Sequence, residues 1–234
     1  MLDAIVLDFD GVIVNSEPLH LRAYQWVLHE EGIEFSARQY YEDFVGLSDA
    51  AVFTRITEGH RGGRDDAWVA AVSARKTERV KRLLRSNSPL FPGAAEHVRL
   101  LAERWPLALA SGALRPEIEQ VLDSTGLRNA FVAVVAAGET PRSKPAPDPY
   151  LRALDRLSAH AGRPLDPAAV VGVEDTVQGL LALRGAGLRR VAVTTTLPAT
   201  ALRVAELIVS DITGVTESRL LALTSSPPTA GPVQ

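Results

Sequence analysis

The chain has 234 residues, of which 46% are hydrophobic and 23% are charged, and its formal net charge is −3. This composition is sufficient for a buried core in one large domain or two smaller ones. It provides no general attraction to nucleic acid or to an anionic membrane, and the absence of cysteine excludes disulfides, thiolate nucleophiles and cysteine-ligated zinc. The sequence lacks a secretory signal pattern and any apolar run near the ~20 residues that span a bilayer. We therefore expect a cytoplasmic protein without nucleic-acid or membrane partners. A monomer is the default expectation, because no long apolar surface helix demands a partner.

The first predicted element is a buried strand at Ala4–Phe9. Four later segments have the same character: they are short, rich in Val, Leu, Ile and Ala, and do not alternate with polar residues. This pattern is typical of parallel strands that are covered on both faces. The four segments are Leu107–Ala110, Phe131–Ala136, Val170–Val173 and Arg190–Thr194.

The segment between the first and second predicted strands contains almost no strand signal. Its helical patterns are Pro18–Glu31, Ala37–Val45, Ala50–Glu58 and Ala67–Leu84. We predict an all-helical cap domain at residues 16–88, which ends at the turn-forming segment Ser88–Gly93. Because ligands bind at the carboxyl ends of the strands in open α/β sheets, an insertion directly after the first strand is expected to act as a lid.

Helical patterns also alternate with the later strands, at Gly93–Glu103, Pro116–Thr125, Asp148–His160 and Val177–Arg184. This alternation predicts an α/β core, at residues 1–15 and 89–223, built as a Rossmann-like doubly wound parallel sheet. The polar, proline-rich tail at residues 224–234 is predicted to be disordered or loosely attached.

Two carboxylates, Asp8 and Asp10, lie at the end of the first predicted strand and are followed by Gly11. Clustered carboxylates at a strand end are costly to desolvate unless a cation compensates them, and hard oxygen ligands suit magnesium. The glycine allows a sharp turn that can present N–H groups to an anion. The alternative is that an aspartate only caps a helix or fills a turn.

Three later segments add further polar groups. Ser111 and Gly112 follow the second predicted strand, where a hydroxyl and a flexible backbone can bind phosphate oxygens, although an ordinary strand-to-helix turn is the favoured explanation when this segment is taken alone. Prolines flank Lys144 and stiffen the chain around it, which favours a fixed ammonium over a solvated surface lysine.

Glu174 and Asp175 end another predicted strand. Adjacent side chains in an extended chain point in opposite directions, so we expect different roles for them; simple helix capping by Asp175 is the alternative. Since a parallel sheet brings the ends of its strands to one edge, these acids, the hydroxyl and the lysine together predict a phosphoryl-transfer site.

These four segments, in this order, resemble the haloacid dehalogenase-like (HAD) hydrolase superfamily, over nearly the whole chain up to about Leu221. The nearest subgroup looks like the β-phosphoglucomutase and phosphoglycolate-phosphatase-like enzymes, which share a helical cap inserted after the first motif. The resemblance implies that Asp8 attacks phosphorus and forms an aspartyl-phosphate. It also implies that Asp10 is first a general acid and then a general base. True dehalogenases of the superfamily lack an acid at the place of Asp10, which argues against dehalogenation.

The resemblance also assigns ligands. It implies a magnesium ion held by Asp8, Asp10 through its backbone carbonyl, Glu174 and Asp175. It implies that Ser111 and Lys144 hold phosphoryl oxygens, with Gly11 and Gly112 beside them.

In the cap, the resemblance implies substrate contacts for His20 and Lys76, and for Gly46 in a specificity loop at Val45–Ser48. The alternatives are a packed helix residue for His20 and a solvated one for Lys76. The mutase places an arginine after this loop to bind a second phosphate, but this chain has Asp49 there. Arg55 is a substitute only if it reaches back over one or two helical turns.

The predicted function is a magnesium-dependent phosphatase of a small phosphorylated metabolite, with a sugar phosphate as one candidate. A β-phosphoglucomutase-type phosphomutase is the first alternative, and the missing arginine weakens it. A phosphonate hydrolase that uses Lys76 and a receiver-like signalling module are the others. Receivers are about half this length and lack a large helical cap.

Overall fold

The computed structural model describes residues 1–44, 47–60, 62–63, 65–86 and 89–227. The chain divides into two compact units. One unit comprises Met1–Asn15 and Pro89–Gln234, and the other comprises Ser16–Ser88. The two units are called the core and the cap below.

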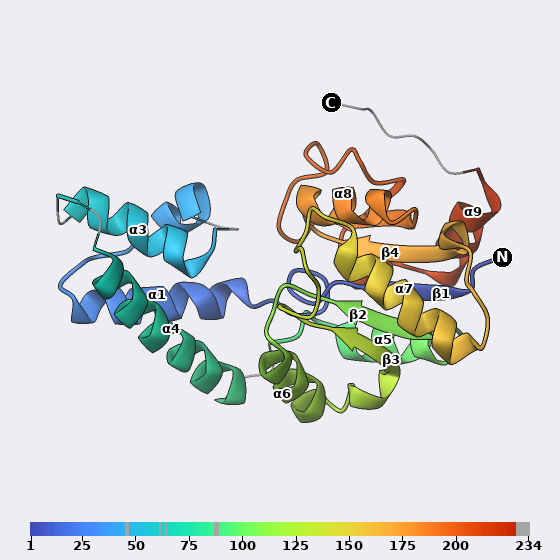
Figure 1. Cartoon of the computed structure of the whole chain (residues 1–234), viewed down its shortest axis with the longest axis horizontal. Coiled ribbons are helices and arrows are strands. Elements are labelled where there is room, and N and C mark those ends of the chain that lie inside the picture. Colours follow the sequence, from blue (N-terminus) through green and yellow to red (C-terminus); the bar gives the residue numbers. More distant parts are fainter. Residues whose placement is uncertain (45–46, 61, 64, 87–88, 228–234) are drawn as a thin grey trace. The chain divides into compact units, whose positions relative to one another are not determined.

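Among the described residues of the core, six parallel strands form one sheet in the order β3-β2-β1-β4-β5-β6 (Figure 1). The strands are β1 (Ala4–Leu7), β2 (Leu107–Ala110), β3 (Phe131–Val135), β4 (Val170–Glu174), β5 (Arg189–Val193) and β6 (Leu207–Val209). The predicted doubly wound parallel sheet is thus confirmed. The sequence reading missed β6, because its three apolar residues are too short a run to stand out from a loop.

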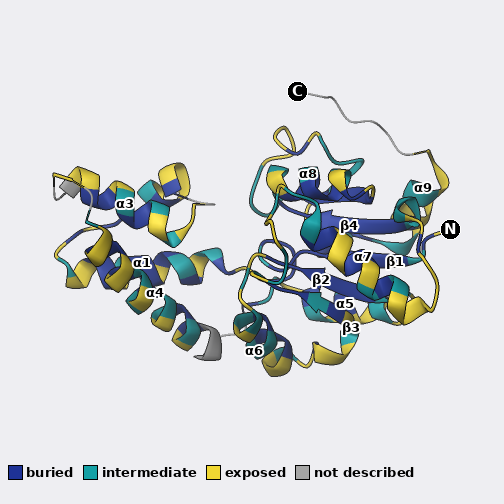
Figure 2. Cartoon of the chain, in the orientation of Figure 1, coloured by how far each residue is buried: buried dark blue, intermediate teal, exposed yellow. Residues whose placement is uncertain are grey.

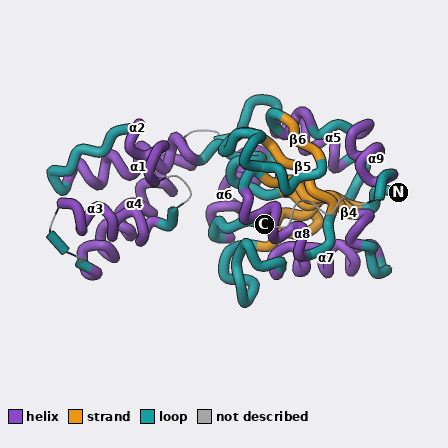
Figure 3. The backbone as a smooth tube through the Cα atoms, turned by 90° about the horizontal axis from the view of Figure 1, so that it is seen from above, coloured by secondary structure: helices purple, strands orange, loops and turns teal. Residues whose placement is uncertain are grey.

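Helices cover both faces of this sheet. Figure 3 shows α7 and α8 on one side of the strands and α5 and α9 on the other. The α-helices of the core are α5 (Ala94–Ala102), α6 (Arg115–Thr125), α7 (Asp148–Ala161), α8 (Val177–Gly185) and α9 (Glu217–Ser225). Short 3-10 turns lie at Arg128–Ala130, Pro167–Ala169 and Ile212–Gly214.

Helix α9 was not predicted, and it includes Thr224 and Ser225, which the sequence reading placed in the tail. The helix forms because Leu220 is buried against the core, and burial of one such side chain contributes about 1.5–3 kcal/mol. Residues 228–234 of the predicted tail lie outside the described residues.

The strands are buried on both faces, as Figure 2 shows for β1, β2 and β4. On one face, Ala4 and Val6 of β1 pack in a cluster with Tyr150 of α7 and Leu183 of α8. Gly172 of β4 allows the close approach of α8, since a Cβ there would lie 2.0 Å from the Leu183 side chain. The uninterrupted apolar character of the strands is therefore explained by helices on both sides.

The described part of the cap is all helical, as predicted. It contains α1 (Glu17–Glu30), α2 (Ala37–Gln39), a π-helical turn (Tyr40–Phe44), α3 (Asp49–His60) and α4 (Asp66–Ser86). Its core is aromatic: the Tyr24 ring lies 5.4 Å from that of Phe53 and 5.9 Å from that of Phe35, measured between centroids. The cap thus has a hydrophobic core of its own.

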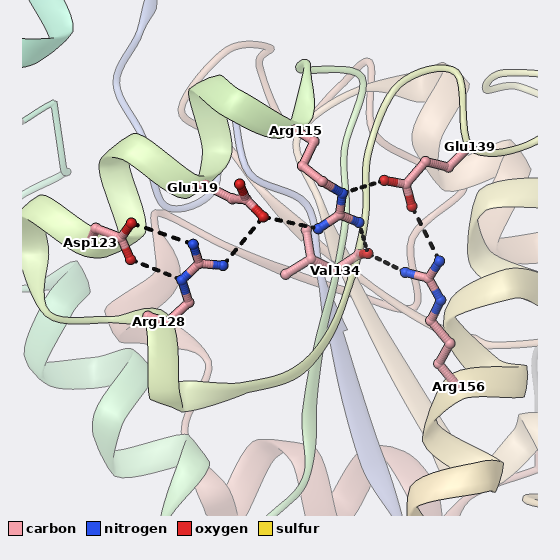
Figure 4. Close-up of polar contacts among 7 residues, drawn as sticks. All are labelled: Arg115, Glu119, Asp123, Arg128, Val134, Glu139 and Arg156. Carbon is pink, nitrogen blue, oxygen red and sulfur yellow. Dashed lines mark hydrogen bonds and ion pairs between the residues drawn. The ribbon is translucent and has the colours of Figure 1, made fainter.

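Strand β3 forms one edge of the sheet, and ion pairs protect that edge (Figure 4). The Val134 carbonyl accepts hydrogen bonds from Arg115, at 2.6 Å, and from Arg156. Glu139 binds both arginines, at 2.5 Å and 3.2 Å. The network satisfies an edge carbonyl that could otherwise pair with another chain. It also ties the loop after β3 to α6 and α7.

No helix in the described part of the chain is both long and apolar enough to cross a membrane.

A buried ion pair joins β5 to the start of β6. Glu206 accepts hydrogen bonds from the Arg189 guanidinium at 3.0 Å and from the Arg190 backbone N–H at 2.9 Å. The side chains of Glu206 and Arg189 are only 2% and 3% exposed. Solvent therefore cannot replace either partner.

We predict that Glu206→Gln lowers the free energy of unfolding by about 3 kcal/mol, because it leaves buried arginine charge unpaired. Urea denaturation measures the change. The matched control is Glu217→Gln, whose pair with Arg104 is 44% and 59% exposed, and which should cost less than about 1 kcal/mol. Equal losses in both variants would contradict the prediction.

Candidate active site

The candidate site lies where the strand order reverses direction. Strand β1 is flanked by β2 on one side and by β4 on the other, and such a switch point leaves a crevice at the carboxyl ends of the strands. Asp8 directly follows β1, Ser111 directly follows β2, and Glu174 is the last residue of β4. The sheet thus brings together three of the four predicted segments.

Lys144 brings in the fourth segment. Its ammonium group donates to Asp8 Oδ1 at 2.7 Å, to Glu174 Oε1 at 2.7 Å and to the Ala110 carbonyl at 2.9 Å. Its side chain is 15% exposed, so it is not a solvated surface lysine. The loop after β3 therefore delivers one positive charge between two acids that belong to different strands.

Glu174 is fully buried, and both of its oxygens accept hydrogen bonds. Oε1 accepts from Lys144 and from the Tyr150 hydroxyl at 2.6 Å. Oε2 accepts from the Asp175 N–H, the Thr176 N–H and the Thr176 hydroxyl, at 3.0–3.3 Å. Gly179 makes room for this carboxylate, since a Cβ there would lie 1.8 Å from it.

Asp175 has a different environment from Glu174. Its Oδ1 atom is buried and has no hydrogen-bond partner among the described residues. Its carboxylate does not cap α8, because the Thr176 hydroxyl accepts the Gly179 N–H at 3.2 Å instead. The two adjacent acids thus differ, as expected: Glu174 is saturated with donors, and Asp175 keeps one oxygen unsatisfied.

Gly11 shapes the wall beside Asp175. Its φ is +76°, and a Cβ there would lie 1.9 Å from Asp175 Oδ2. Its N–H donates to the Val14 carbonyl at 2.8 Å, which closes the turn, so the Gly11 N–H itself is already paired. The glycine instead supplies a left-handed turn and space for the Asp175 carboxylate.

Electrostatics separate the three acids. Burial raises the pKa of Asp8 well above its usual range, although Lys144 opposes this shift. Burial acts on Glu174 as well, but the Lys144 ammonium and several hydrogen bonds outweigh it and lower the pKa of that carboxyl. Burial and then the charge of Glu174 raise the pKa of Asp175 to about 7. Asp8 and Asp175 are therefore acids with too little compensating charge.

These residues fit a divalent cation. Carboxylate oxygens of Asp8, Glu174 and Asp175 lie within 4.8 Å of one another, and Lys144 supplies a single opposing charge. The unsatisfied Asp175 Oδ1 is an oxygen ligand without a partner, which is the donor type that magnesium prefers. Asp8 and Asp175 are the best placed to hold it, because every oxygen of Glu174 already has donors. The predicted ligand from Asp10 is its backbone carbonyl and not its carboxylate, and it stays a prediction.

The other predicted core residues lie near the same edge. Ser111 is buried, and its Oγ accepts the Ala113 N–H at 2.9 Å, which leaves its O–H able to donate. At Gly112 a Cβ would meet no atom within 4 Å, so packing does not require a glycine there. Asp10 lies partly buried, two residues after Asp8.

Two of the predicted cap residues form one polar cluster with Asp49. Lys76 Nζ lies 2.7 Å from His20 Nδ1 and 2.6 Å from Asp49 Oδ1, and its side chain is 2% exposed. It is therefore not a solvated helix lysine. The Tyr24 hydroxyl also donates to Asp49, at 2.5 Å. Gly46 lies outside the described residues, and Arg55 is exposed and donates to the Asp43 carbonyl.

The sequence reading missed several residues of the site. Tyr150 was hidden because it belongs to the apolar face of α7. The Thr195 hydroxyl donates to the Gly11 carbonyl at 2.5 Å, and the Thr196 hydroxyl bonds Asp175. These threonines follow β5, and hydroxyls beyond a predicted strand end were a signal that could have found them.

We predict that Gly11→Ala is more destabilising than Gly162→Ala. Both glycines are left-handed, with φ of +76° and +67°, which costs an alanine about 1–2 kcal/mol. Only at Gly11 does the new methyl collide with Asp175, whereas Gly162 has no atom within 4 Å. Urea denaturation should show at least about 1 kcal/mol more loss for Gly11→Ala. Equal losses would mean that the turn and the carboxylate are not coupled.

We also predict a pH dependence from His20. Burial and the adjacent Lys76 ammonium lower the pKa of His20 from 6.5 to about 4. The unfolded chain therefore binds this proton at higher pH than the folded chain, so the free energy of unfolding should fall as the pH drops from about 6.5 to about 4. Denaturant titrations across this range should show that the free energy of unfolding depends less steeply on pH in His20→Gln than in the parent protein. An unchanged slope would contradict the prediction.

The sequence of this chain matches a known protein family. Residues 2–187 match the haloacid dehalogenase-like hydrolase family. Hexitol phosphatase B of Escherichia coli is 32% identical over an alignment of 201 residues that covers 81% of this chain and 82% of that protein. Fructose-1-phosphate phosphatase YqaB of E. coli is 30% identical over 184 residues, which are 79% of this chain and 92% of that protein.

Solved structures of similar fold agree with this family assignment. CbbY from Rhodobacter sphaeroides in complex with phosphate has a TM-score of 0.74 at 26% identity, covering 91% of this chain and 95% of that one. β-Phosphoglucomutase from Clostridium difficile has a TM-score of 0.76 at 21% identity, covering 96% and 98%, and this likeness concerns the fold. The predicted family and subgroup are confirmed. The chain belongs to the haloacid dehalogenase-like hydrolase family, and it is an enzyme with a β-phosphoglucomutase-like fold.

Proposed function

We propose that this chain is a magnesium-dependent phosphatase of a small phosphorylated sugar or sugar alcohol, with Asp8 as its nucleophile. The observation that carries the proposal is the Asp8 carboxylate, held by Lys144 at 2.7 Å within a group of buried acids at the carboxyl end of β1. The names of the relatives, hexitol phosphatase and fructose-1-phosphate phosphatase, support the substrate class.

In the first step, an Asp8 oxygen attacks phosphorus and the bond from phosphorus to the sugar oxygen breaks. Asp10 gives its proton to that leaving oxygen, so the sugar departs as an alcohol. The Lys144 ammonium and the Ser111 hydroxyl offset charge on the phosphoryl oxygens. Lys144 is suited to this role because the acids around it hold it charged in a fixed position.

In the second step, Asp10 takes a proton from a water molecule, and the oxygen of the hydroxide that forms attacks the phosphorus of the aspartyl-phosphate. Inorganic phosphate leaves, and the Asp8 carboxylate is restored. A bound magnesium ion would supply the positive charge that lets two anions, the carboxylate and the phosphate ester, approach each other. Asp8, Asp175 and the Asp10 backbone carbonyl are its proposed ligands, with Glu174 beside them.

The cap residues His20, Gly46 and Lys76 are proposed to contact the substrate. The phosphomutase is the alternative function. The cap cluster favours the phosphatase. A phosphomutase would need an uncompensated positive charge in the cap to bind the second phosphate of a bisphosphate, but the Asp49 carboxylate lies 2.6 Å from the Lys76 ammonium.

We predict that Asp8→Asn lowers phosphate release by at least about a thousandfold, because an amide cannot act as the nucleophile. Release is measured with magnesium on hexitol phosphates, fructose 1-phosphate and β-glucose 1-phosphate, and a chelator should abolish it. The matched control is Asp123→Asn, an exposed acid paired with Arg128, which should leave turnover unchanged.

Two outcomes would contradict the proposal. Full activity of Asp8→Asn would remove Asp8 from the chemistry. Conversion of β-glucose 1-phosphate to glucose 6-phosphate without phosphate release would make the enzyme a phosphomutase.

A further inference from the structure

One buried polar side chain at the site has no part in the steps above. Tyr150 lies in the first turn of α7 and is 0% exposed. Its hydroxyl donates to Glu174 Oε1 at 2.6 Å, and the centroid of its ring lies 5.0 Å from Lys144 Nζ. The sequence alone marks it only as a core residue of an amphipathic helix.

The acceptors of Lys144 define its position completely. An ammonium group has three N–H donors. The described acceptors of Lys144 are Asp8, Glu174 and the Ala110 carbonyl. A small shift of the Glu174 carboxylate would therefore change the length of the contact between Lys144 and Asp8.

Tyr150 restrains the Glu174 oxygen that Lys144 uses. Both side chains donate to Oε1, whereas the donors to Oε2 come from Asp175 and Thr176. Without the phenol donor, Oε1 would keep more uncompensated negative charge, and it would draw the ammonium toward Glu174 and away from Asp8. The hydroxyl thus balances the pull of two carboxylates on one cation.

We propose that Tyr150 is a positioning residue for phosphoryl transfer: its hydroxyl holds Glu174 so that the Lys144 ammonium stays against Asp8. This inference rests on the proposed function and adds to it a role for α7. In the same view, Glu174 serves as the anchor of Lys144, while Asp8 and Asp175 carry the oxygens available to a cation.

The test is Tyr150→Phe, which removes one oxygen and keeps the ring that packs in the core. Loss of a hydrogen bond to a charged group should lower kcat about tenfold. Inhibition by inorganic phosphate should weaken as well, because a displaced Lys144 binds the anion less well. A merely structural tyrosine would change the unfolding midpoint and neither of these values.

Ser158→Ala is the matched control, since it also removes a hydroxyl from α7. Its Oγ accepts the Leu165 N–H at 3.1 Å, away from the candidate site. This variant should keep the kcat and phosphate inhibition of the parent. Assays at a temperature well below the unfolding midpoint of each variant compare folded protein only.

The outcomes separate this proposal from the proposed function. If Asp8→Asn is inactive and Tyr150→Phe has the kcat and phosphate inhibition of the parent, the positioning role is refuted and the phosphatase stands. If Ser158→Ala loses as much kcat as Tyr150→Phe, the effect is general to α7 and the role is also refuted. If Asp8→Asn is fully active, both proposals fail.

Discussion

The candidate site depends on one buried ammonium. Lys144 lies between Asp8 and Glu174, and neither acid could remain charged at low cost in that environment without it. Removing a cation from water is itself expensive, and only acceptors on every donor of the ammonium compensate for this. The geometry of the site is therefore determined by how many donors and acceptors meet at this point.

The sheet makes this arrangement possible. Lys144 belongs to a loop after β3, the edge strand, whereas Asp8 directly follows β1 and Glu174 ends the adjacent strand β4. The ion pairs of Arg115, Glu139 and Arg156 connect that loop to the helices α6 and α7 (Figure 4). A residue distant in sequence is thus delivered to the switch point by rigid elements.

The three acids are alike in composition and unlike in environment. Glu174 receives donors on both oxygens, so its charge is stable and its position is restrained. Asp8 is buried with fewer hydrogen-bond donors than Glu174, and Asp175 retains an oxygen without a hydrogen-bond partner. A nucleophile and a metal ligand both require available lone pairs, and an anchor requires the opposite. The donor count separates these roles where residue type does not.

The amino-acid sequence alone determined the alternation of strands and helices, the helical insertion and the four polar segments at strand ends. Apolar periodicity and strand-end position are local signals, and they carry this information. The sequence did not reveal β6, α9, the Glu206 ion pair or the hydrogen bonds of the Tyr150 and Thr195 hydroxyls. Each of these depends on a partner far along the chain, and Tyr150 has the same local pattern as any core residue. Only the tertiary structure decided which acid has hydrogen-bond donors on both oxygens and which keeps an oxygen without a donor. The donors Lys144 and Tyr150 are distant from Glu174 in the sequence and adjacent to it only in the folded chain.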